Sequence, residues 1–253
     1  MRLYKQILKE NDCFKDGKKI VPKGVMVHST GANNPNLRRY VAPNDGIIGE
    51  PSMSHWNQPG RNACVHAFIG KTADGSIATY QTLPWDMRGW HCGGYANNTH
   101  ISFEICEDNL KNEAYFSAVY QEAVELTAHL CRMFDLDPLA PGVVITHAEG
   151  NQMGWASNHG DVLHWFPKHG KTMDDFRRDV SRIMEEDTMT EARIREIIRD
   201  ELQKIETERA DLSASPWAVG LLATAKAKGI TDGSRPQSYA TRQEVAIMVN
   251  AVK

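Results

Sequence analysis

Two histidines follow apolar, β-prone runs that lie far apart in the sequence. Val25-Met-Val leads into His28, and Val143-Val-Ile-Thr leads into His147. A neutral imidazole is a common protein ligand for zinc, and the end of a strand is a rigid place to mount one. Downstream, the polar turn Ser157-Asn-His-Gly-Asp161 brings a carboxylate within reach. Two histidines and one carboxylate with an open coordination position are a recurrent catalytic zinc arrangement.

Two features near these residues bear on the chemistry. His159 and His164 lie in or just after the same turn, and either is an alternative to Asp161 as the third ligand. Glu104 stands on the apolar run 100–106. A carboxylate in such a run is costly to bury unless a cation or metal lies nearby. We therefore expect Glu104 to face the same site.

The surrounding pattern predicts a sheet covered by helices. Residues 64–70 and 76–82 are β-rich runs around an Asp-Gly turn and predict a hairpin. Residues 113–134 carry apolar side chains at helical spacing and predict a long helix packed on the sheet, and a second helix begins near Thr172. The expected fold is α/β, with a central mixed β-sheet flanked by helices.

The N-terminal segment and the first long loop are less regular. Residues 1–23 are polar with a short helical pattern, and residues 11–17 predict a turn. Residues 30–62 are rich in Gly, Asn and Pro. Long loops in compact domains are usually functional, so we expect this segment to form a wall of the cleft.

The composition changes near Glu186, where we place the end of a catalytic domain, 1–186. Residues 187–212 have no Gly or Pro, are rich in charge and carry a narrow apolar stripe from Ile194 to Ile205, which predicts a helical linker or a short coiled coil. Residues 213–253 predict a small module of two helices joined by a Gly-rich loop. About forty residues is marginal for independent folding, so we expect this module to self-associate or to dock.

The overall composition excludes some classes of function. The chain has 253 residues, 41% of them hydrophobic, and a net charge of −3, which gives no basic footprint for nucleic acid. The first ten residues alternate in charge and predict neither a signal peptide nor a membrane anchor, so we expect synthesis in the cytoplasm. Its five cysteines show no Cys-x-x-Cys spacing, and we expect reduced, mostly buried thiols.

Six fragments in order resemble the type 2 N-acetylmuramoyl-L-alanine amidases, which are zinc enzymes that share their fold with peptidoglycan recognition proteins and occur as bacteriophage endolysins. The resemblance covers about residues 20–185. The fragments are Val-His-Ser-Thr at 27–30, Val-His-Ala-Phe-Ile-Gly at 65–70, Gly-Trp-His at 89–91, Ser-Phe-Glu-Ile-Cys at 102–106, Thr-His at 146–147 and Asn-His-Gly-Asp at 158–161.

This resemblance implies a role for each residue of the site. It implies His28, His147 and Asp161 as ligands of Zn2+, and Glu104 as the carboxylate that moves a proton or orients water. The family often has a lysine where this chain has His159, which is then the group that polarises the substrate. The family motifs also place three residues along the cleft as substrate-binding candidates: His66, Trp90 and His91. Orienting or packing roles are the alternative for the two histidines, and core packing is the alternative for Trp90.

A second departure from the family pattern concerns the hairpin. A tyrosine often precedes the hairpin histidine, but this chain has Val65 there, which removes a hydroxyl from the site. The reaction that the resemblance implies is hydrolysis of the amide between N-acetylmuramic acid and L-alanine in peptidoglycan, in the manner of a phage lysin that is made in the host cytoplasm and acts at the cell wall.

The C-terminal module resembles one S-layer homology repeat, a unit that attaches proteins to cell-wall polymers. The resemblance is carried by Ala-Lys-Gly-Ile-Thr-Asp-Gly at 227–233 and Ala-Thr-Arg-Gln-Glu-Val at 240–245. It implies wall binding, with homo-oligomers supplying the several copies that such repeats usually need. Two rival functions are a non-catalytic wall-recognition protein and a zinc peptidase that cuts the stem peptide. The complete ligand set argues against a non-catalytic recognition protein. The sequence contains no His-Glu-x-x-His helix motif, which would have supported a zinc peptidase.

Overall fold

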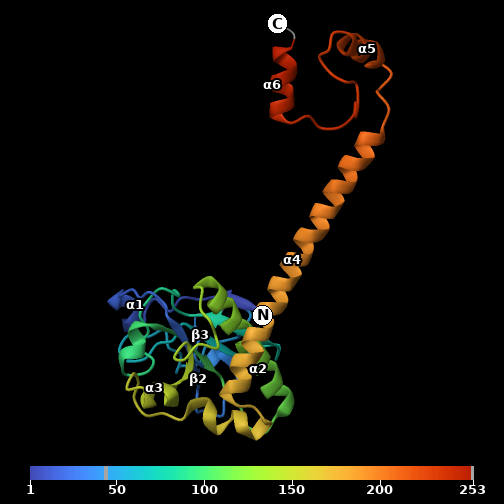
Figure 1. Cartoon of the computed structure of the whole chain (residues 1–253). Helices are drawn as coiled ribbons and strands as arrows, with labels where there is room; N and C mark the ends of the chain where they lie inside the picture. The colour runs from blue at the N-terminus through green and yellow to red at the C-terminus, as the bar shows by residue number, and fades with distance from the viewer. Residues whose placement is uncertain (43–44, 252–253) are drawn as a thin grey trace. The chain divides into compact units, whose positions relative to one another are not determined.

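The chain forms two compact units, Met1–Glu186 and Asp187–Lys253. The computed structural model, drawn in Figure 1, describes residues 1–42 and 45–251, apart from the side chains of residues 187–190. The N-terminal unit contains the sheet and all of the candidate site residues. The C-terminal unit is helical among its described residues.

A six-stranded sheet with the order β1-β4-β3-β5-β2-β6 forms the centre of the N-terminal unit. Its strands are β1 (Leu3–Lys5), β2 (Gly24–Ser29), β3 (Ala67–Lys71), β4 (Ile77–Gln81), β5 (His100–Ile105) and β6 (Val144–Thr146). Neighbouring strands are parallel except for β3 and β4, which form the predicted antiparallel hairpin. The predicted mixed sheet is thus confirmed, and β2 lies between β5 and β6.

Helices cover the sheet. The long helix α2 (Glu113–Met133) buries the predicted apolar stripe against one face, where Val25 and Val27 of β2 also point. The first turns of α4 (Met173–Asp211) add Phe176 and Val180 to the same core. The shorter helices of this unit are α1 (Asp12–Asp16), α3 (His147–Gln152), η1 (Leu37–Arg39), η2 (Tyr95–Asn98), η3 (Asp161–His164) and η4 (Phe166–His169).

The N-terminal segment differs from the prediction. Leu3–Lys5 is not helical but forms the edge strand β1, which pairs in parallel with β4. The expected turn at residues 11–17 contains the short helix α1, because the Asn11 side chain accepts the amide N–H of Cys13 and Gly17 ends the helix at φ 68°. A glycine adopts this left-handed conformation without steric cost, which is why the helix stops there.

The expectation of reduced thiols is wrong for one pair of cysteines. Cys13 and Cys64 form a disulfide, and Cys92, Cys106 and Cys131 are free and buried. The bond ties α1 to the segment that precedes β3. Because Cys64 also forms a β-bridge with Trp90, the disulfide is connected directly to the loop that carries His91.

In the C-terminal unit, α4 is followed by α5 (Val219–Ala227) and α6 (Arg242–Asn250). The two helices and the loop between them match the predicted pattern. Neither α5 nor α6 has a buried residue. Among the described residues, none of the helices combines the length and the apolar character that a membrane span requires.

Candidate metal centre and cleft

The register of the sheet places His28 beside Glu104. Residues of β2 alternate between the two faces, so His28 points away from α2 while Val25 and Val27 point towards it. His28 is paired with Glu104 of β5 across the parallel ladder. Residues paired in this way project to the same side of the sheet, so the imidazole and the carboxyl group share one face.

His147 is placed by the junction of β6 and α3. Thr146, the last residue of β6, caps α3 by accepting the amide N–H of Glu149, whose carboxylate in turn accepts the amide N–H of Thr146. This capping box satisfies backbone donors at the helix start and fixes the direction in which the chain leaves the sheet. His147 is the first residue of the helix, and its side chain is buried.

Asp161 opens η3 with a backbone φ of 43°. Non-glycine residues rarely adopt this left-handed region, and aspartate is among the few that do so at moderate cost. The residue sits where the loop from α3 returns to the sheet. Its conformation directs the carboxylate to the two histidines.

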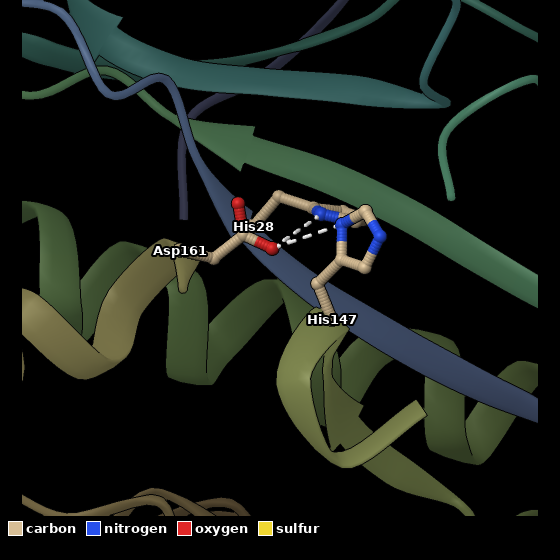
Figure 2. Close-up of side chains that lie close together, drawn as sticks. All are labelled: His28, His147 and Asp161. Atoms are coloured by element: carbon tan, nitrogen blue, oxygen red, sulfur yellow. Dashed lines mark hydrogen bonds and ion pairs between the residues drawn. The ribbon is translucent and has the colours of Figure 1, made fainter. Parts of the chain in front are cut away.

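The three predicted ligands converge. Asp161 Oδ2 lies 3.0 Å from His28 Nδ1 and 3.2 Å from His147 Nδ1. One potential ligand atom from each residue lies within 4.8 Å of the others. Figure 2 shows both imidazole rings turned towards the Asp161 carboxylate, His28 from β2 and His147 from the start of α3. Among the described residues, this is the group whose geometry fits a metal ion.

The outer nitrogen of each imidazole also has a partner. His28 Nε2 lies 3.1 Å from His91 Nδ1, and His147 Nε2 lies 3.1 Å from Ser157 Oγ. The Ser157 hydroxyl donates to the carbonyl of Cys92, which leaves its oxygen to accept from His147 when Nε2 carries the proton. Contacts of this kind hold the rings in place, and they give the Nε2 proton an acceptor when a metal takes the place of the proton on Nδ1. The donor set therefore fits zinc.

A single side chain anchors the loop that carries His91. The Asn97 carboxamide oxygen accepts the amide N–H groups of His91 and Cys92 at 2.9 and 3.0 Å. On the other side, Trp90 exchanges backbone hydrogen bonds with Cys64. His91 is thus fixed from both directions along the chain before it contacts His28.

Burial and hydrogen bonding set the protonation of these groups. Burial lowers the pKa of His28, and it outweighs the opposing effect of Asp161. For Asp161, burial raises the pKa, but hydrogen bonds from His147 and His28 outweigh it and hold the pKa below the usual range. Burial raises the pKa of Glu104 well above its ordinary value, reinforced by the negative charge of Asp161. One carboxyl group of the site is therefore anionic and the other readily protonated.

A cleft of about 650 Å³ opens beside the cluster. Glu104, Trp90, His91 and His159 all border it together with the three predicted ligands. The Nδ1 atom of His159 lies 3.2 Å from Ser157 Oγ, and its ring stands 4.6 Å from the His147 ring. The structure thus places His159 at the rim of the cleft, while the ligand cluster itself contains Asp161.

His66 does not border the cleft. Its side chain is fully buried, with Nε2 donating to the Met87 carbonyl at 2.7 Å and Nδ1 accepting the amide N–H of Ser102 at 3.0 Å. Both nitrogens are used in holding β5 to the segment around Met87. The fold therefore gives His66 a structural position instead of the predicted contact with substrate.

Sequence reasoning missed two groups at the cleft. Ser157, which holds His147, lies in a turn that drew attention only for its histidine and aspartate. Glu107 is buried, accepts the amide N–H of Gly31 at 3.0 Å, and lies 3.0 Å from Nε2 of His164, which borders the cleft. The signal for Glu107 was its position two residues after the end of β5, the strand that also carries Glu104.

Together, the fold and the cluster define an α/β domain with a candidate metal centre that opens into a cleft. The chain belongs to the N-acetylmuramoyl-L-alanine amidase family, whose sequence profile matches residues 17–162. The matched segment contains all three converging residues and Glu104. Family membership supports amidase activity on peptidoglycan. Comparison of the sequence with curated proteins gives no significant match.

Solved structures confirm the fold. The hydrolase AmiA of Staphylococcus aureus, solved in complex with its ligand, is 18% identical, with a TM-score of 0.53 over 72% of this chain and 82% of that chain. The PlyG catalytic domain is 21% identical, with a TM-score of 0.51 over 72% of this chain and 94% of that chain. At these identities the likeness concerns the fold alone.

Proposed function

We propose that this protein is a zinc-dependent N-acetylmuramoyl-L-alanine amidase that cleaves the bond between N-acetylmuramic acid and L-alanine in peptidoglycan. The observation that carries the proposal is the convergence of His28, His147 and Asp161 beside a cleft that also holds Glu104. Two imidazoles and one carboxylate leave the fourth position of a tetrahedral zinc site for water or substrate. When bound there, zinc lowers the pKa of a coordinated water from about 15.7 to about 7 and polarises the scissile carbonyl.

Glu104 is the group that we assign to proton transfer. Glu104 is half-buried and shares a sheet face with His28, and one of its carboxyl oxygens is buried without a hydrogen-bond partner in the described structure. Burial raises its pKa well above the ordinary value. A carboxyl group in this state accepts a proton from the attacking water and returns it to the leaving amine with a small change in driving force.

His159 and Trp90 serve the substrate in this proposal. His159 stands at the rim of the cleft, where an imidazole N–H can stabilise negative charge that develops on the carbonyl oxygen. Trp90 offers a partly exposed ring to the sugar or peptide. His91 also borders the cleft, but its contact with His28 gives it the further task of holding a metal ligand.

We further propose that the protein acts at the bacterial cell wall as a lysin of the phage type. Support comes from the family and from the order of the motifs. The C-terminal unit, with its likeness to one S-layer homology repeat, would bind wall polymer and hold the catalytic unit at the wall. Several apolar side chains of α5 and α6 are exposed, which is consistent with association between copies.

Product analysis on purified peptidoglycan tests the reaction. An amidase releases new L-alanine amino termini from the glycan strands. New reducing ends would indicate a glycosidase, termini within the stem peptide would indicate the peptidase, and binding without cleavage would indicate the recognition protein.

Metal analysis tests the site separately. We expect about one zinc per chain, lost in both His28→Ala and His147→Ala, because each substitution removes one of three ligands. His129→Ala is a matched control, since this histidine lies on α2 outside the cluster. Full zinc content in both ligand variants would place the metal elsewhere.

A further inference from the structure

Four apolar side chains of α4 are exposed along one side of the helix in the C-terminal unit. Their exposed fractions are 52% for Ile194, 53% for Ile198, 58% for Leu202 and 43% for Ile205. Steps of three and four residues keep them on one face, because an α-helix turns once in about 3.6 residues. We call these four residues the α4 seam. Ile194, Ile198 and Leu202 line a continuous surface together with charged residues on one edge.

The charges around the seam have a definite order. Glu191 precedes the seam and Arg209 follows it. The two residues are 18 positions apart, about five full turns, so both point in the same direction as the seam. On one edge, Arg195 lies near the start, Arg199 near the middle and Glu206 near the end. At the two ends of the seam the order of charges is therefore negative and positive, then negative and positive. Reversing the direction of the helix exchanges the signs of these four end charges, so the ends are complementary to each other, whereas Arg199 comes to lie near Arg199 of the second copy at the axis.

We propose that α4 pairs with α4 of a second copy of this chain in antiparallel orientation. A two-fold axis near residue 200 sets Ile194 against Ile205 of the second copy and Ile198 against Leu202. The same axis brings Glu191 to Arg209 and Arg195 to Glu206. Such an isologous interface, in which each contact occurs twice, is the usual form of a two-fold dimer.

Parallel pairing fits the same surface less well. It would place Glu191 beside Glu191 and Arg209 beside Arg209 in the seam, and like charges in close contact disfavour an arrangement. Near the middle of the seam, Arg199 on one edge and Glu201 on the other would favour parallel pairing, but they are two charges against the four at the ends. The end charges, which would all face like charges in the parallel pair, thus favour a second copy in the antiparallel direction.

Contacts within one chain are compatible with this pairing. Arg195 forms an ion pair with Glu191 at 2.7 Å, and Arg209 lies over the Tyr239 ring at 4.4 Å and donates to the Gln237 carbonyl at 3.5 Å. A guanidinium has five N–H donors, so further acceptors remain possible. In the pair, each Glu191–Arg195 ion pair joins Glu206 and Arg209 of the second copy in a four-charge group of alternating sign.

Pairing would bring two C-terminal modules into one particle. Two weak wall-binding sites on one particle raise retention on a polymeric surface without any new type of contact, provided that both engage. The pairing itself is independent of the amidase reaction. It is therefore tested without substrate.

Cysteine cross-linking tests whether the two α4 helices run antiparallel or parallel. The native cysteines do not interfere, because two form a disulfide and the other three are buried. A mixture of Ile194→Cys and Ile205→Cys chains should form a mixed disulfide dimer, while each variant alone should form little. Self-cross-linking of each variant alone would show parallel pairing. No cross-link in any combination, with a monomer in sedimentation up to high concentration, would overturn the proposal.

Charge reversal tests whether the charges at the ends of the α4 seam favour the pairing. Glu191→Lys should weaken the dimer about 10-fold, because two attractive pairs become repulsive, and Arg209→Glu should do the same. Combining both substitutions should restore association, since the signs are exchanged but remain complementary. Asp200→Lys is the matched control, with the same change of charge on the far side of the helix. Equal weakening by Asp200→Lys, or no recovery in the double variant, would contradict the pairing scheme.

Discussion

His91 offers a sharp test of how the fold prepares the proposed metal centre. Substitution by leucine removes the Nδ1 atom that lies 3.1 Å from His28 Nε2. The His28 side chain is only 2% exposed, so water does not replace the lost partner. A buried N–H without an acceptor costs about 1–3 kcal/mol, or roughly 5- to 150-fold in an equilibrium constant. Loss of such contacts to metal-binding histidines typically costs about 10- to 100-fold in affinity. We therefore expect His91→Leu to bind zinc about 10- to 100-fold more weakly.

The assay is competition with a zinc chelator of known affinity. His91→Asn is the matched variant, because its side chain is similar in size to leucine but carries an oxygen near the position of Nδ1. We expect His91→Asn to recover most of the affinity. Unfolding of the metal-free proteins controls for general damage. Unchanged zinc affinity in His91→Leu would refute the reasoning, and equal losses in both variants would assign the effect to packing.

Three further predictions concern the reaction, the pH dependence of stability and the role of the second unit. Glu104→Gln should keep zinc but lower kcat by ~10²–10⁴, measured as release of L-alanine amino termini; a normal kcat would exclude it from proton transfer. Burial lowers the pKa of His66 to about 4, whereas the unfolded chain takes up this proton near pH 6.5. The free energy of unfolding should therefore fall as pH drops from about 6.5 to 4, by about 3 kcal/mol from this residue. Urea unfolding at several pH values should show a smaller change of this free energy with pH in His66→Gln than in the unsubstituted protein. An equal change with pH in both proteins would contradict the assignment. A 1–186 fragment should cleave soluble muramyl peptides like the full chain but be retained less on whole sacculi; a fragment inactive on both would show that the second unit helps to build the site.

The parts of the site that follow from local pattern were predictable from the sequence. The runs that end in His28 and His147 are β-prone over several residues, and the sheet then fixes where they end. The contact between His28 and His91 was not predictable in this way, because it depends on the Asn97 anchor and on the bridge to Cys64. Each of these is a tertiary contact of a single side chain, and such contacts leave no periodic signal.

Long-range pairing also explains the errors at the N-terminus. Leu3–Lys5 is too short and too polar to predict a strand, and it becomes one only because β4 offers a free edge. Cys13 and Cys64 are 51 residues apart, and neither their spacing nor their neighbours predicts the bond. At the other end, the change of composition near Glu186 does not interrupt α4, because a continuous helix requires only the absence of breakers such as Gly and Pro.

The backbone of Asp161 implies a trade-off between stability and activity at the centre of the site. A left-handed aspartate costs free energy of about 1 kcal/mol that a glycine at the same position would not. The residue that best relaxes this turn is therefore one that cannot bind a metal. Selection for stability alone would remove this carboxylate, which we propose as a metal ligand. The presence of aspartate in this conformation therefore marks a place where the chain gives up some folding free energy to keep a carboxylate beside two histidines. Engineering for thermostability should accordingly leave this turn unchanged and seek its gains elsewhere in the fold.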